Sequence, residues 1–183
     1  NKIIKQSTFT YVRQKQMLGL GHAILSGEPL IGSEAFAVIL ADDLCDTEDK
    51  GVISQLIEVF DRYQCSIVAI EEVSKSEASK YGIIDGYLLD NSEGIYQVTE
   101  MIEKPDEKIA PTNLAIIGRY ILTPDIFHIL KDIKPDKNGE IQITDALNIQ
   151  AKKGSVIAVK FKGKRFDCGG ITGFIEATNF FAD

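Results

Sequence analysis

Apolar and polar positions alternate along the chain in blocks that predict strands and helices in turn. Apolar residues recur at helical spacing between Val52 and Tyr63, which predicts an amphipathic helix. Ala35–Leu40 is a continuous apolar run, which predicts a strand buried on both faces, and Ser66–Ile70 predicts the next buried strand. Such alternation is typical of an α/β domain with a mixed, mostly parallel sheet.

The other elements are read from the same periodicities. The pattern predicts further strands at Phe9–Arg13, Leu114–Leu122 and Val156–Phe161, and helices at Ala23–Ser26, Pro124–Leu130, 144–152 and Ile171–Phe181. Thr144 is expected to cap the third of these helices. Between Tyr81 and Glu103 the apolar runs are short and separated by Gly86 and Asn91, which predicts a small antiparallel insertion with tight turns.

Composition limits the classes of protein that the chain can belong to. With 183 residues, 44% of them hydrophobic, residues 1–183 can bury one core and form a single domain. A net charge of -7 argues against a nucleic acid partner, and no apolar run approaches the roughly 20 residues of a membrane helix. The 3 cysteines are odd in number and widely spaced, which favours free thiols in a reducing cytoplasm.

Two aspartates follow predicted strands. The apolar run of Ala35–Leu40 is followed by Ala41 and then Asp42, and Asp167 follows the last strand. Open α/β sheets bind ligands beyond the carboxyl ends of their strands, and Mg²⁺ prefers one or two carboxylates together with phosphate oxygens and water. The pair is therefore a candidate Mg²⁺ site, although such residues also serve as caps and turn formers. Asp43 and, less directly, Asp46 are alternative ligands.

The triplet Glu103-Lys104-Pro105 is a candidate substrate site. Pro105 stiffens the turn and restricts Lys104 to an extended conformation. A carboxylate can accept hydrogen bonds from sugar hydroxyls, and an ammonium suits a phosphate. The alternative is an ordinary surface turn with two solvated charges.

The segment from Gln14 to His22 contains a second candidate. Gly19 and Gly21 could bring backbone N–H groups close to a ligand, and the Gln14 amide could pair with a nucleobase edge. The segment is neither a Walker loop nor a complete dinucleotide fingerprint. His22 has no metal-ligand partner at a suitable spacing and is expected to be structural.

Taken in order, these segments resemble the bacterial UTP:glucose-1-phosphate uridylyltransferases and, more loosely, the glucose-1-phosphate thymidylyltransferases. The resemblance rests on Val12–Gln14, Gly19–Ala23, Ala37–Asp43, Tyr81–Ile84, Glu103–Pro105, Pro111–Tyr120, Glu140–Ala146 and Asp167–Gly169. It implies the Rossmann-like fold of the nucleotide-diphospho-sugar transferases. It also implies formation of UDP-glucose and pyrophosphate from UTP and glucose 1-phosphate with Mg²⁺, and assembly into dimers or tetramers.

The resemblance also implies roles for individual residues. Asp42 and Asp167 would bind Mg²⁺ and, with Lys104, form the catalytic set. The implied substrate contacts are Gln14 and Gly19 with uracil, Gly82 and Glu103 with the glucose hydroxyls, Lys104 with the sugar phosphate, and Asn113 within the segment lining the sugar pocket.

One departure from the family concerns its N-terminal glycine-rich loop, which would cradle the triphosphate and has no counterpart here. We therefore expect these residues to be the C-terminal portion of a longer enzyme, with a sheet incomplete at its N-terminus and negligible turnover by this portion alone. The alternatives are a thymidylyltransferase, a non-catalytic sugar-phosphate-binding module and a plain α/β interaction domain.

Overall fold

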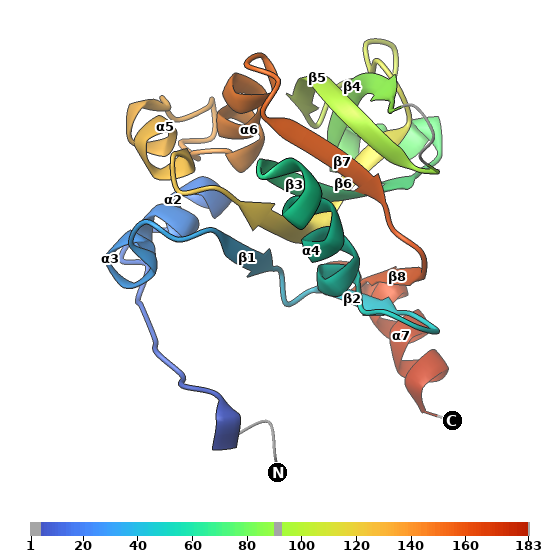
Figure 1. Ribbon diagram of the computed structural model, residues 1–183. Helices are drawn as coiled ribbons and strands as arrows, with labels where there is room; N and C mark the ends of the chain where they lie inside the picture. Colours follow the sequence, from blue (N-terminus) through green and yellow to red (C-terminus); the bar gives the residue numbers. More distant parts are fainter. Residues whose placement is uncertain (1–4, 90–92, 183) are drawn as a thin grey trace.

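The fold centres on one mixed sheet. The structure, a computed structural model, describes residues 5–89 and 93–182. The sheet has 6 strands in the order β1-β6-β3-β7-β5-β4, and β2 and β8 form a separate pair (Figure 1). The strands are β1 (Phe36–Ile39), β2 (Asp43–Asp46), β3 (Ser66–Glu72), β4 (Gly82–Leu88), β5 (Ile95–Glu103), β6 (Leu114–Leu122), β7 (Val156–Lys160) and β8 (Lys164–Asp167).

Helices pack on both faces of this sheet. The helices are α2 (Gly19–Ser26), α3 (Glu28–Ile31), α4 (Val52–Tyr63), α5 (Ile126–Asp132), α6 (Ile143–Ala151) and α7 (Ile171–Phe181), with a 3₁₀ helix η1 at Lys75–Lys80. The helices α2, α5 and α6 lie on one face and α4 lies on the other, whereas α7 packs against β8 of the separate pair. Within the described ranges, no helix is long and apolar enough to cross a membrane.

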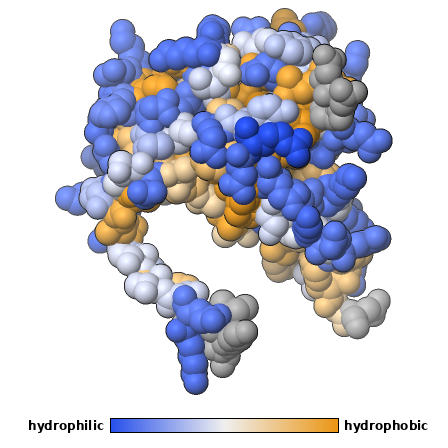
Figure 2. Space-filling view, viewed as in Figure 1, coloured by the Kyte–Doolittle hydropathy of each residue, from blue (hydrophilic) through white to orange (hydrophobic). Residues whose placement is uncertain are grey.

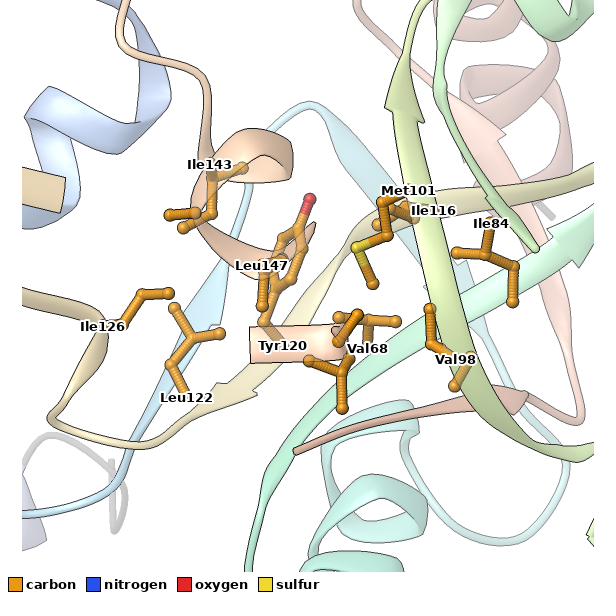
Figure 3. Packing of buried hydrophobic residues seen from close by; sticks show 14 of the residues in the cluster. Val68, Ile84, Val98, Met101, Ile116, Tyr120, Leu122, Ile126, Ile143 and Leu147 are labelled. Carbon is orange, nitrogen blue, oxygen red and sulfur yellow. The ribbon is translucent and has the colours of Figure 1, made fainter. Parts of the chain in front are cut away.

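The two faces of the sheet carry separate hydrophobic clusters. Val68 and Ile70 of β3 point into a cluster with α2, α5 and α6, whereas Ile67 and Ala69 point into one with α4. This division follows from the two-residue period of a strand. Figure 3 shows the first cluster, in which Tyr120 of β6 lies among side chains from several elements. The α/β class predicted from the sequence is confirmed.

The expectation of a mostly parallel sheet is wrong for the described residues. There, β3 and β7 are the one parallel pair, and the other neighbours run antiparallel. The strands β3 and β6 are indeed apolar over nearly their whole length. A continuous apolar run reports burial on both faces, but it carries no information about the direction of the neighbouring strand.

Strand β1 is an edge strand, so the prediction of full burial is also wrong. Phe36 and Val38 pack against the core, but Ala37 and Ile39 are exposed. β1 pairs with β6 through the register Phe36 opposite Leu122, and the described residues place no strand on its other side. Its outer backbone edge is therefore unpaired by a strand among the described residues, and the face that carries Ala37 and Ile39 is exposed.

The predicted insertion is an antiparallel hairpin that belongs to the main sheet. β4 continues through Gly86, where the sequence predicted a turn, and the pairing with β5 shifts between Asp85 and Gly86. A side chain at Gly86 would overlap the Gln97 carbonyl, so glycine allows the close approach at this bulge. Asn91, the other predicted turn residue, lies outside the described residues.

The segment predicted as the first strand is not one. Phe9–Arg13 has no regular structure, and Phe9 and Tyr11 are 63% and 92% exposed. Figures 1 and 2 show this segment standing away from the body of the molecule. Its apolar pattern resembles a strand, but a strand also requires a hydrogen-bonded neighbour, which the described residues do not supply.

Helix boundaries were predicted with mixed success. The bounds of α4 and α7 are confirmed, whereas α2 begins at Gly19, earlier than expected. The N-cap position of α6 is Gln142, whose side chain makes no capping hydrogen bond, so the prediction that Thr144 caps the helix is wrong. Thr144 lies inside the first turn, and its hydroxyl donates to Glu103 instead.

Packing of α4 on the sheet gives a first prediction. Leu56 is completely buried between this helix and the sheet, while its neighbour Ile57 is 43% exposed. Leu56→Ala is expected to lower the free energy of unfolding by about 3 kcal/mol, because it removes buried methyl groups and leaves a cavity. The control Ile57→Ala should cost less than about 1 kcal/mol. Urea denaturation checks both, and equal effects would contradict this packing.

Candidate functional site

A cavity of about 340 Å³ opens beside the ends of several strands. Its walls come from the β1–β2 turn, the starts of β4 and α6, the ends of β5 and β8, and β6. Five residues of the implied site line it, namely Asp42, Gly82, Glu103, Lys104 and Asp167, and so does the alternative ligand Asp43. The chain thus brings together side chains that are up to 125 positions apart.

The two predicted metal ligands converge at one point. β2 and β8 pair antiparallel, and the Cys168 amide donates to the backbone oxygen of Asp42 at 2.7 Å. A methyl group on Gly169 would lie 3.1 Å from Oδ1 of Asp167 and 3.4 Å from Oδ2 of Asp42. Gly169 therefore leaves space that both carboxylates face.

Asp167 is held by hydrogen bonds on both oxygens. Its Oδ2 accepts from the Tyr81 hydroxyl at 2.7 Å and lies 3.3 Å from Nη2 of Arg165, while Oδ1 accepts from the Gly169 amide at 3.1 Å. Burial acts to raise the pKa of Asp167, but Tyr81 and Arg165 outweigh it, so the pKa lies below its ordinary value. The carboxylate is therefore ionised at neutral pH.

Both carboxylate oxygens of Asp43, the alternative ligand, already accept hydrogen bonds from other residues of the chain. Its side chain is buried, Oδ2 accepts from the Gly118 amide at 2.6 Å, and Oδ1 accepts from Nε of Arg165. Asp46 lies at the other end of the β2–β8 ladder, opposite Lys164, and is not among the residues lining the cavity. The geometry therefore favours Asp42 over both alternatives.

Glu103 and Gly82 lie opposite each other at the junction of β4 and β5. Oε2 of Glu103 accepts a hydrogen bond of 2.6 Å from the Thr144 hydroxyl. A methyl group on Gly82 would lie 3.0 Å from that hydroxyl and 3.3 Å from Glu103 Oε2. Glycine at this position therefore leaves the carboxylate accessible to a ligand.

Lys104 differs from its predicted conformation. Its φ is 45°, in the left-handed region, whereas the following Pro105 predicted an extended residue. Its amide donates to the Tyr81 carbonyl at 3.0 Å, which fixes the turn against this preference. The side chain is 55% exposed and its ammonium lies 3.5 Å from Glu103 Oε1, so it remains able to meet an anion.

The other predicted contacts are not among the cavity-lining residues, although one of them, Gly19, lies against the cavity-lining Glu140. Gln14 donates to the Gly19 carbonyl at 3.1 Å and lies 2.9 Å from Nδ1 of His22, so Gln14 and Gly19 form a cluster of their own. Asn113 donates to the Val73 carbonyl at 3.3 Å. None of these residues is among those that line the cavity in the described chain.

Sequence reasoning gave no site role to several polar residues of the cavity wall, among them Tyr81, Tyr120, Thr144 and Arg165. Tyr81 and Arg165 adjoin predicted site residues, which is the signal that could have found them. The Tyr120 ring belongs to the core, and burial raises the pKa of its hydroxyl. Figure 3 shows this hydroxyl directed away from Val68 and Leu122.

The donor set is compatible with a metal ion bound mainly by substrate. Among the described residues, no group of three or more His, Cys, Asp or Glu is arranged to hold a metal. Two converging carboxylates are what Mg²⁺ uses when phosphates and water supply its remaining ligands. Asp42 and Asp167 therefore fit a Mg²⁺ ion that binds together with a phosphorylated ligand.

Fold and site together define an α/β protein with a polar cavity and paired carboxylates at the ends of its strands. Residues 2–183 match the nucleotidyl transferase family, and the chain belongs to that family.

Relatives of known identity are similar over most of this chain. A UTP–glucose-1-phosphate uridylyltransferase of Pseudomonas aeruginosa is 58% identical over 98% of this chain and 64% of its own length. A crystal structure of UDP-glucose pyrophosphorylase complexed with UDP-glucose has a TM-score of 0.95 at 60% identity and covers 99% of this chain and 68% of that chain. The crystal structure of the apo-enzyme has a TM-score of 0.94 at 60% identity and covers 99% of this chain and 66% of that chain. The chain thus spans 64% of the first curated relative.

Proposed function

We propose that the protein carrying this chain transfers a uridylyl group from UTP to glucose 1-phosphate, giving UDP-glucose and pyrophosphate. The observation that carries the proposal is the convergence of Asp42 and Asp167 beside a cavity that also presents Glu103 and Lys104. The names of the similar enzymes, and the UDP-glucose named with one similar structure, support this substrate pair.

The reaction needs no nucleophile from the protein. A phosphate oxygen of glucose 1-phosphate attacks the α-phosphorus of UTP, and the bond from that phosphorus to the bridging oxygen of pyrophosphate breaks. Because the attacking oxygen is already anionic, the protein has to position the reactants and offset their charge. Asp42 and Asp167 would hold Mg²⁺, which neutralises charge on the phosphates when bound.

The remaining cavity residues are assigned to the sugar phosphate. The exposed ammonium of Lys104 would meet the phosphate of glucose 1-phosphate. Glu103 would accept hydrogen bonds from glucose hydroxyls, since Thr144 occupies its Oε2 and leaves further lone pairs. Gly82 would admit the sugar close to the backbone.

Uracil recognition by Gln14 and Gly19 stays a prediction, as does a sugar-pocket role for Asn113. Contact of Gln14 with uracil would require its amide to exchange its present partners, Gly19 and His22. Assembly into a dimer or tetramer is also a prediction. The 3 free thiols are consistent with the predicted cytoplasmic location.

Calorimetry with UDP-glucose tests the proposed site. The complete gene product should bind UDP-glucose, and Mg²⁺ should tighten binding about tenfold or more, since a cation held by both carboxylates would offset the charge of the diphosphate. Asp42→Asn should abolish this Mg²⁺ effect. Binding that ignores Mg²⁺, or that does not distinguish UDP-glucose from UDP, would contradict the assigned site.

The Tyr120 hydroxyl gives a prediction about sugar binding. It makes no hydrogen bond to another described residue while it lines the cavity, so a sugar hydroxyl is its expected partner. Tyr120→Phe should raise KM for glucose 1-phosphate about fivefold, the worth of one neutral hydrogen bond, with KM for UTP unchanged. Steady-state kinetics check this, and equal changes in both KM values would contradict it.

A further inference from the structure

Arg165 connects three segments of the chain beneath the paired aspartates. Its side chain is 6% exposed, and its three nitrogens each face a different carboxylate. Nε donates to Asp43 beside the β1–β2 turn, Nη1 donates to Glu71 at the end of β3, and Nη2 lies 3.3 Å from Asp167 at the end of β8. One buried cation therefore fixes the relative positions of these segments.

Tyr81 completes this arrangement. Its ring lies under the Arg165 guanidinium, with 4.9 Å between the guanidinium carbon and the ring centroid, and its hydroxyl donates to Oδ2 of Asp167. Arg165 and Tyr81 thus both engage Oδ2. Oδ1 of Asp167 is left on the side of Gly169 and Asp42.

We propose that Arg165 is a positioning residue for the paired carboxylates: it holds the Asp42-bearing turn and the Asp167 side chain in the relative placement that binds the cation. This inference rests on the proposed function and deepens it. Groups that orient metal ligands without touching the metal commonly change metal affinity 10- to 100-fold when they are removed.

Direct binding of a substrate phosphate is the competing role for Arg165, because it also lines the cavity. The geometry disfavours that role. Each of its three nitrogens already has a carboxylate partner, and the planar guanidinium cannot turn toward a phosphate without breaking these contacts. The burial of the Arg165 side chain also disfavours direct contact with a substrate phosphate.

The test measures binding of Mn²⁺, as a spectroscopic substitute for Mg²⁺, to the complete gene product saturated with UDP-glucose. Electron paramagnetic resonance counts free Mn²⁺ directly and does not depend on turnover. Arg165→Met should raise the Kd for Mn²⁺ about tenfold or more. Arg165→Lys should raise it to an intermediate value, because lysine keeps the positive charge but lacks the several N–H donors of the planar guanidinium. Binding of UDP-glucose without metal should change less than about twofold.

Two further variants keep the test decisive. Arg165→Met leaves buried Asp43 without its cation and can fail to fold. Glu71→Gln removes a partner that contacts Arg165 from a half-buried position, and it should raise the Kd for Mn²⁺ about threefold while the fold is retained. The control Lys164→Met removes a neighbouring exposed cation that lies over Phe166 and Phe180. This variant should leave the Kd for Mn²⁺ unchanged.

The outcomes separate the inference from the function on which it rests. Unchanged Mn²⁺ affinity in Glu71→Gln and in a folded Arg165 variant, with normal binding by the wild type, overturns the positioning role alone. Weaker binding of metal-free UDP-glucose, equal to the loss in Mn²⁺ affinity, overturns it in favour of direct substrate contact. Absence of Mn²⁺ binding by the wild-type complex overturns both the inference and the proposed function.

Discussion

Asp167→Asn is expected to lower kcat/KM for UDP-glucose formation about a thousandfold, because it removes one of two carboxylates that would hold Mg²⁺. That factor corresponds to about 4 kcal/mol of transition-state stabilisation, which is within the range supplied by a bound metal ion. Steady-state kinetics at saturating Mg²⁺ measure it. The Asp167 side chain is 40% exposed, so the variant should still fold.

The control for this prediction lies on the same ladder. Asp46→Asn removes the same charge from the far end of β2, outside the cavity wall, and should retain activity within about twofold. Circular dichroism on both variants would establish that the sheet is intact. Loss of less than about tenfold in Asp167→Asn would show that the carboxylate is not needed for metal binding.

Gly118→Ala is expected to destabilise the fold strongly. A methyl group there would lie 2.6 Å from both Asp43 Oδ2 and Leu40 Cβ, and the Asp43 oxygen is the one that accepts from the Gly118 amide. Overpacking and loss of this buried hydrogen bond should together cost about 3 kcal/mol or more. For a domain of this size, the melting temperature should fall by about 6 to 12 °C.

Gly51→Ala is the matched control for Gly118→Ala. No atom lies within 4 Å of the position that its methyl group would take, and the φ of -53° suits any residue. Its free energy of unfolding should change by less than about 1 kcal/mol. If Gly118→Ala costs no more than Gly51→Ala, Asp43 does not pack against this strand as described.

The sequence predicted the regular elements better than their arrangement. The bounds of α4 and β6 were predicted because periodicity and apolar length reflect local burial directly. The direction of neighbouring strands, the edge position of β1 and the irregular Phe9–Arg13 segment depend on which segments meet in space, and no local pattern records that.

The candidate site was predictable where residues follow strands. Asp42 and Asp167 were expected to meet because strand ends share one edge of the sheet, and they do converge. Arg165 and Thr144 were missed because their importance comes from partners far along the chain. Asn113 could be placed only by resemblance, and its amide instead ties two loops together.

The most direct test of the proposed function is pyrophosphate release by the complete gene product from glucose 1-phosphate, with UTP and dTTP offered in parallel. Uridylyl transfer predicts Mg²⁺-dependent release that is faster with UTP, and the release should disappear when Mg²⁺ is chelated. Release that favours dTTP would contradict the uridylyl assignment. No release with either nucleotide would contradict catalysis at the paired aspartates.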